Sequence, residues 1–153
     1  MENDPQIHHR RSIRLKGYDY TQPGAYFVTI CAFQREEIFG EVVEGEMRLN
    51  PSGEIVREEW LKTPEIRSNV ELHEDEFVIM PNHIHGIIWI IESQPVGATR
   101  RVAPTIGSRT LVPGSIGAIL GQFKSITAKR INVLRGTNGV AVWQRNYYDH
   151  VVR

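Results

Sequence analysis

Two histidines separated by a single residue, His83 and His85, are the side chains of this sequence best suited to chemistry. They open a run of β-branched and apolar residues, 83–91, that is typical of a strand. Side chains alternate faces along a strand, so both imidazoles project from one side while Ile84 points to the other. Two imidazoles one pleat apart can share a metal ion, although the remaining ligands must come from elsewhere. The alternative is an incidental pair on an exposed strand face.

The setting favours the chemical interpretation. Residues 77–80 form a second apolar run, separated from the first by Pro81 and Asn82, which indicates two strands joined by a tight turn. Pro81 excludes the primed turns common in hairpins, so we expect a type II turn with Asn82 in the left-handed region. Ionisable groups at the end of an otherwise buried strand are commonly placed for chemistry.

The elements that must position the pair follow from hydrophobic period and caps. Strands are expected at residues 26–33, 70–80, 83–91 and from 140 onward, with a small hairpin at 39–49. The order strand, helix, strand, strand, helix, strand predicts an α+β fold of the ferredoxin-like or RRM-like type, βαββαβ. Its antiparallel sheet has both helices on one face. We expect the histidine pair on the open face.

Both expected helices have clear start signals. Asn50 caps the first, with Pro51 at its first position, and the helix runs toward Pro64. Ser115 caps the second, which residues 136–139 end. The side chains expected to pack on the sheet are Val56 and Trp60 of the first helix and Ile116, Leu120, Phe123, Thr127 and Leu134 of the second.

With 153 residues, the chain is long enough for a core, and we expect one domain over 1–153. Residues 94–113 are rich in proline and glycine and are predicted to form a mobile loop. No apolar run approaches a bilayer span and the start lacks a signal-peptide region, so a cytoplasmic protein without membrane contact is expected. The single Cys31 excludes an internal disulfide and a cysteine-based zinc site, and it is expected to be buried.

The net charge of zero conceals a segregation. Residues 17–92 contain fifteen acids and five basic residues, whereas residues 93–153 contain nine basic residues and one acid. Such asymmetry is typical of a phosphate-backbone partner, with a solvated basic face as the alternative. The side chains expected to contact nucleic acid are Arg10, Arg11, Arg14, Lys124, Lys129, Arg130 and Arg145, with Trp143 or Tyr148 available to stack on bases.

Residues 80–86, Met-Pro-Asn-His-Ile-His-Gly, resemble the His-hydrophobic-His (HUH) signature of the tyrosine transposases of small single-strand insertion sequences. The similarity is greatest to the REP-associated tyrosine transposases. The segments 17–20, 23–30, 123–125 and 143–150 are similar to the same family. The likeness covers nearly the whole chain, and residues 94–113 match least.

The resemblance implies a chemistry. In that family the two histidines hold a divalent cation, usually magnesium or manganese, against the scissile phosphate of single-stranded DNA. A tyrosine hydroxyl attacks, leaving a 5′-phosphotyrosine and a free 3′-hydroxyl. By matching positions, His83 and His85 carry over as catalytic residues and metal ligands. The implied partner is single-stranded or hairpin DNA, and an exposed sheet edge would permit a homodimer.

The resemblance also implies what this chain lacks. In the family the nucleophilic tyrosine, and commonly a further metal ligand, lie on a helix beyond the segment similar to residues 148–153. Neither has a matching position, so the chain is expected to be C-terminally incomplete, with strand cleavage weak or absent. Tyr147 and Tyr148 match an aromatic pair that precedes that helix, and sheet packing or base stacking explains them better than catalysis.

Three functions remain open from the sequence. The first is a metal-dependent transposase that nicks and rejoins DNA. The second is a catalytically inactive nucleic-acid-binding module with a vestigial HUH motif. The third, a metal-dependent enzyme on small phosphate esters, is disfavoured because the basic residues are spread far beyond one pocket. A steep salt dependence of DNA affinity would separate the third from the first two.

Overall fold

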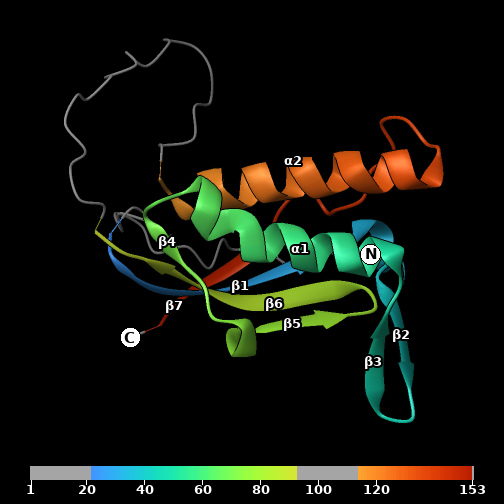
Figure 1. Ribbon diagram of the computed structural model, residues 1–153, viewed down its shortest axis with the longest axis horizontal. Coiled ribbons are helices and arrows are strands. Elements are labelled where there is room, and N and C mark those ends of the chain that lie inside the picture. The colour runs from blue at the N-terminus through green and yellow to red at the C-terminus, as the bar shows by residue number, and fades with distance from the viewer. Residues whose placement is uncertain (1–21, 93–113, 153) are drawn as a thin grey trace, which may run out of the picture.

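Two helices cover one face of an antiparallel sheet in the computed structural model, which describes residues 22–92 and 114–152 (Figure 1). The predicted contacts of Arg10, Arg11 and Arg14 and the predicted loop 94–113 lie outside the described residues. No helix in those two ranges is long and apolar enough to cross a membrane. The elements are β1 (Gly24–Cys31), η1 (Phe33–Arg35), β2 (Gly40–Val43), β3 (Glu46–Leu49), α1 (Pro51–Ile66), β4 (Val70–Glu71), η2 (Glu74–Glu76), β5 (Phe77–Met80), β6 (His83–Ile90), α2 (Ile116–Arg135) and β7 (Tyr148–Val152).

The sheet has the order β4-β6-β1-β7, and β5 pairs with β6 on the same side as β4. All of these pairings are antiparallel, and β1 and β6 pair along their full length. This topology confirms the predicted α+β, ferredoxin-like architecture with both helices on one face. The small hairpin is also confirmed: β2 and β3 form a separate two-stranded ribbon that turns at Glu44 and Gly45, both with positive φ.

Several details of the prediction were wrong. Leu134, expected to pack on the sheet, is 51% exposed. The expected strand 70–80 is broken by η2, whose three successive acids have low strand propensity. The last strand begins at Tyr148, because Trp143 makes only an isolated bridge with Ala32 in place of a continuous ladder. Asn82 does not take the left-handed conformation expected for a type II turn.

Both predicted caps are confirmed. Asn50 Oδ1 accepts a hydrogen bond from the Gly53 N–H (2.9 Å), and Ser115 Oγ accepts one from the Ala118 N–H (3.2 Å). Helix α1 continues past Pro64 to Ile66, because a proline in the last turn removes only one backbone hydrogen bond. Helix α2 ends at Gly136 in the left-handed conformation.

A glycine lets α1 approach the sheet closely. Gly86 of β6 faces the helices, and a Cβ added there would lie 2.4 Å from Cζ2 of Trp60. The indole of Trp60 also stacks on Phe77, which pairs with Gly86 across β5 and β6, with ring centroids 4.5 Å apart. Trp60 is 2% exposed, so this contact lies inside the core. The glycine of the His-Ile-His-Gly segment therefore has a packing role.

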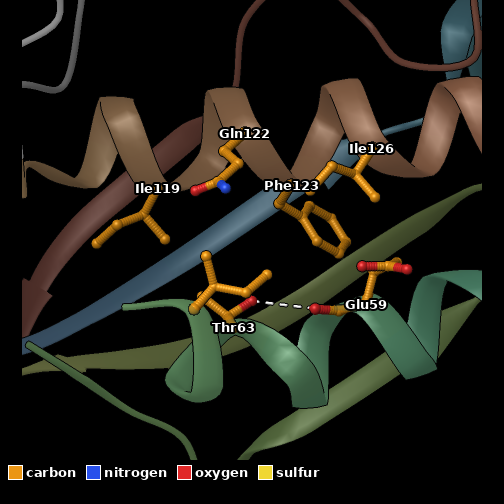
Figure 2. A pocket seen from close by; sticks show the side chains of 7 residues that line it. Glu59, Thr63, Ile119, Gln122, Phe123 and Ile126 are labelled. Atoms are coloured by element: carbon orange, nitrogen blue, oxygen red, sulfur yellow. Dashed lines mark hydrogen bonds between the residues drawn. The ribbon is translucent and has the colours of Figure 1, made fainter. Parts of the chain in front are cut away.

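The helices are joined to each other by polar contacts. Arg130 of α2 donates to the buried Glu59 carboxylate (2.7 Å) and to Glu58 (2.9 Å), both on α1. Side chains of both helices also line a narrow cleft, where the Thr63 hydroxyl donates to the Glu59 carbonyl (3.1 Å; Figure 2). The Gln122 amide oxygen in this cleft already accepts a hydrogen bond from Arg67 (2.7 Å). We therefore interpret the cleft as part of the packing between α1 and α2 and not as a ligand site.

We predict that Gly86→Ala lowers the free energy of unfolding by about 1–3 kcal/mol, because the added methyl overlaps the Trp60 ring. Chemical denaturation followed by circular dichroism measures the loss. In a Trp60→Leu background, which removes the ring, the same substitution should cost less. An equal cost in both backgrounds would contradict the proposed contact.

We predict that Arg130→Gln lowers stability by about 1 kcal/mol, a modest value because the Arg130 side chain is 38% exposed and solvent screens the pair. The matched control is Lys129→Gln at the exposed neighbouring position, expected to change stability by less than about 0.5 kcal/mol. Thermal unfolding of both variants at the same salt concentration measures the difference. If Arg130→Gln and Lys129→Gln were equally stable, the ion pair would have no structural role.

Candidate functional site

The two histidines lie on the sheet face that the helices leave open. Along β6, Ile84, Ile88 and Ile90 are buried against the helices, while His83 and His85 alternate with them and are half-buried. This confirms the expectation that both imidazoles share the open face.

Each imidazole is held through its Nδ1 atom. The ring centroids of His83 and His85 are 4.6 Å apart and the planes meet at 75°. His83 Nδ1 lies 2.6 Å from Asn82 Oδ1, and His85 Nδ1 lies 2.9 Å from Thr29 Oγ1. No residue in the described ranges makes a hydrogen bond with either Nε2. The Nε2 atoms are thus the ones available to a ligand.

An aromatic contact further restrains His85. Its ring stacks on Phe27 of the neighbouring strand β1, with centroids 5.6 Å apart and planes 19° from parallel. Phe27 is itself 39% exposed, so the stacked pair forms part of the open surface. The imidazole plane of His85 is therefore set by a hydrogen bond on one edge and a ring on one face.

Local electrostatics favour a neutral imidazole. Burial lowers the pKa of His83 from its usual value, and repulsion from His85 and then from Arg35 lowers it further. Both causes favour the neutral form of the His83 ring, which is the form that has a free lone pair.

The two Nε2 atoms could supply two ligands of a divalent cation. Imidazole nitrogen suits transition metals, whereas magnesium prefers oxygen ligands, so manganese fits better than magnesium. Within residues 22–92 and 114–152 no group of three or more His, Cys, Asp or Glu side chains could hold a metal ion. The remaining positions would therefore be filled by water, by phosphate oxygens or by residues outside those ranges.

Other open-face residues surround the pair. Cys31 lies opposite His83 in the β1–β6 register and is half-buried, so the expectation of a buried core cysteine was wrong. Tyr148 pairs with Thr29, which pairs with His85, so the three lie in one row across β7, β1 and β6. Tyr148 is 37% exposed, consistent with the predicted availability for stacking.

Three of the residues expected to contact nucleic acid have internal partners instead. Trp143 is buried and its Nε1 donates to Thr127 Oγ1 (2.8 Å), so its ring is not available to stack on a base. Lys124 Nζ donates to the Gln144 carbonyl (2.5 Å), and burial lowers its pKa. Arg130 shares its charge with Glu58 and Glu59. For these three the structure favours a role in packing.

Two other expected contacts remain on the surface but apart from the pair. Lys129 is exposed on α2, in the helical layer on the other side of the sheet from the histidines (Figure 1). Arg145 is exposed in the segment that precedes β7. The structure thus brings His83, His85 and Tyr148 onto one face and does not bring Lys129 there.

The sequence prediction missed the partners of the histidines. Thr29 is 56 residues from His85 in the chain and meets it only through the β1–β6 register. Phe27 is likewise distant from His85 in the chain and contacts it only because β1 and β6 pair. Asn82 could have been found, because an amide side chain directly before a histidine is within hydrogen-bonding reach of its ring.

Comparison with known proteins finds a clear relative in sequence. No family model matches this sequence. An uncharacterized protein of Haemophilus influenzae is 40% identical over 153 residues, which covers 96% of this chain and 81% of that protein.

Two solved structures match this chain. A REP-associated tyrosine transposase bound to a REP hairpin matches with a TM-score of 0.55 at 15% identity, over 92% of this chain. The match spans 63% of that chain, less than two thirds of its length. A candidate transposase from Deinococcus radiodurans matches over 92% of this chain and 85% of that chain, with a TM-score of 0.47 and 15% identity.

Sequence and structure therefore point to different levels of relationship. Identity of 15% establishes a shared fold and nothing finer, whereas 40% identity over almost the whole chain establishes common descent. The chain belongs to the same family as the Haemophilus influenzae protein, and its fold is similar to that of a REP-associated tyrosine transposase.

Proposed function

We propose that this chain is the DNA-binding core of an HUH-type tyrosine transposase, which holds a divalent cation on His83 and His85 beside a phosphodiester of single-stranded or hairpin DNA. The observation that carries the proposal is the presentation of two imidazoles on an open sheet face, each held through Nδ1. The fold supports it, because the similar transposase was solved with a hairpin bound.

The proposed chemistry divides between the cation and the chain. Manganese or magnesium, when bound, would supply a Lewis acid that offsets charge developing on the phosphate as a tyrosine hydroxyl attacks. His83 and His85 would hold the cation through their Nε2 atoms, and Phe27 fixes the plane of the His85 ring. The open face leaves room for an extended strand to reach the pair.

A second candidate is a nucleic-acid-binding module in which the histidines have no catalytic role. The observation that favours it is the exposure of two aromatic side chains, Phe27 (39%) and Tyr148 (37%), on the same open face. Exposed rings on the open face of an RRM-like sheet are suited to stacking on bases. The two candidates differ in whether binding needs the metal.

We predict that the full chain binds a labelled DNA hairpin more tightly with manganese than with EDTA, and that His83→Ala or His85→Ala abolishes this difference. Each imidazole supplies one of the two ligands proposed within the described residues, so we expect a loss of about tenfold or more in manganese affinity. Gel shift and fluorescence anisotropy measure the DNA affinity, and the same samples are scored for cleavage and for a denaturation-resistant adduct.

The matched control is His150→Ala, because His150 is exposed and lies on the same face, opposite Phe27. It should bind manganese and the hairpin as the wild type does. If EDTA leaves wild-type hairpin affinity unchanged, or if His150→Ala loses as much as His83→Ala, the metal proposal fails.

A further prediction, at Tyr148, distinguishes the nucleic-acid-binding module from the metal-dependent transposase. Tyr148→Ala should weaken hairpin binding in EDTA by about 1–3 kcal/mol if its ring stacks on a base. Val152→Ala, an exposed aliphatic position on the same strand and face, is the control. Loss at Tyr148 with no effect of His83→Ala in either buffer would favour the binding module over the transposase.

A further inference from the structure

We infer that Thr29 and Asn82 are positioning residues of the histidine pair. They hold His85 and His83 in the tautomer that carries its proton on Nδ1 and leaves the Nε2 lone pair free. The use of that lone pair for a cation rests on the proposed function, but the tautomers are properties of the chain itself.

The orientation of the Asn82 amide follows from its two partners. Its Nδ2 donates to the Arg35 carbonyl oxygen (3.4 Å), and its Oδ1 lies 2.6 Å from His83 Nδ1. A carbonyl oxygen accepts and never donates, so the amide nitrogen must face Arg35 and the amide oxygen must face His83. The proton of this short hydrogen bond therefore belongs to His83 Nδ1.

The backbone holds the Asn82 side chain in place. The Asn82 carbonyl accepts from the Ala32 N–H (2.8 Å), and the Pro81 carbonyl accepts from the Phe39 N–H (3.1 Å). Both residues of the turn are thus bonded to segments outside their own hairpin. The acceptor that orients His83 is built into this turn.

Thr29 orients the second ring from a different strand. It pairs directly with His85 in the β1–β6 register, and side chains paired in this way have Cβ atoms about 4.5–5.5 Å apart. The branched threonine side chain has few rotamers, which keeps its hydroxyl aimed at Nδ1. A hydroxyl can donate or accept, and we assign it the acceptor role toward His85, which matches the arrangement at His83.

The consequence concerns affinity. A neutral imidazole without a fixed partner exchanges between its two tautomers, and one of them carries a proton on the nitrogen that a cation needs. Partners that fix the other ring nitrogen of a metal-binding histidine typically change metal affinity by about 10–100-fold. Thr29 and Asn82 would therefore act on metal binding without touching the cation.

The test begins with metal-free protein. Long-range ¹H–¹⁵N correlation spectra at about pH 8, above the usual imidazole pKa of about 6.5, report which ring nitrogen carries the proton. We expect unprotonated Nε2 in both histidines of the wild type. Thr29→Val should raise the Nε2-protonated fraction at His85 alone, and Asn82→Ala should raise it at His83 alone.

Manganese affinity, measured by electron paramagnetic resonance, is the second readout. Each variant should bind about tenfold more weakly than wild type, and Thr29→Ser, which keeps the hydroxyl, should restore binding. Thr63→Val is the matched control, because it removes a threonine hydroxyl bonded to the Glu59 carbonyl in α1, in the helical layer. It should leave both tautomers and the manganese affinity unchanged.

The outcomes separate this inference from the proposed function. Protonated Nε2 in either wild-type histidine would overturn the inference without any variant, even if a variant fails to fold. Unchanged tautomers in folded Thr29→Val and Asn82→Ala would overturn it as well. The expected tautomers together with no manganese binding by wild type would support the positioning role and refute the metal proposal.

Discussion

The antiparallel register of β1 and β6 is the constraint on which the whole arrangement depends. It places Thr29 opposite His85 and Cys31 opposite His83 on the open face. On the other face it aligns Val28 with Gly86, where the missing side chain admits the ring of Trp60. A slip of one residue would turn Thr29 toward the helices and expose Val28 in its place. Core packing and the histidine partners therefore both result from the pairing of β1 with β6. The side chains that face the helices make this register far more stable than a register shifted by one residue.

Much of this architecture is local enough to be predicted from sequence. Asn50 and Ser115 cap helices because their side chains accept from backbone N–H groups three residues ahead. Strand alternation alone placed His83 and His85 on one face. The contact between Thr29 and His85 was out of reach, since it depends on a register between segments far apart in the chain. Trp143 was misassigned for a related reason, because residue type does not reveal that two consecutive side chains, Val142 and Trp143, are both buried.

The basic residues of the last third of the chain are less available at the surface than the composition suggested. The basic character of the last third of the chain suggested a phosphate partner, but charges count toward such a partner only when they are unpaired at the surface. Arg130 is committed to two acids of α1, and Lys124 to backbone carbonyls beside β7. The Arg130 ion pairs join the basic part of the chain to the acidic part, whereas the Lys124 contacts stay within the basic part. The segregation seen in the sequence thus contributes partly to folding, and the open sheet face, with its histidines and exposed rings, becomes the more informative feature for nucleic acid.

The break between β4 and β5 bears on how the protein avoids unwanted assembly. In place of one long outer strand, β6 has neighbours of only two and four residues, with Glu74, Asp75 and Glu76 between them. A long, flat, apolar edge would offer another chain a row of unpaired N–H and C=O groups, whereas short segments beside a cluster of negative charges offer few. The sheet edge formed by β4 and β5 is therefore poorly suited to pairing with the edge of another sheet. Among the strands that the structure describes, β7 at the opposite edge is the longer outer strand that another chain could pair with.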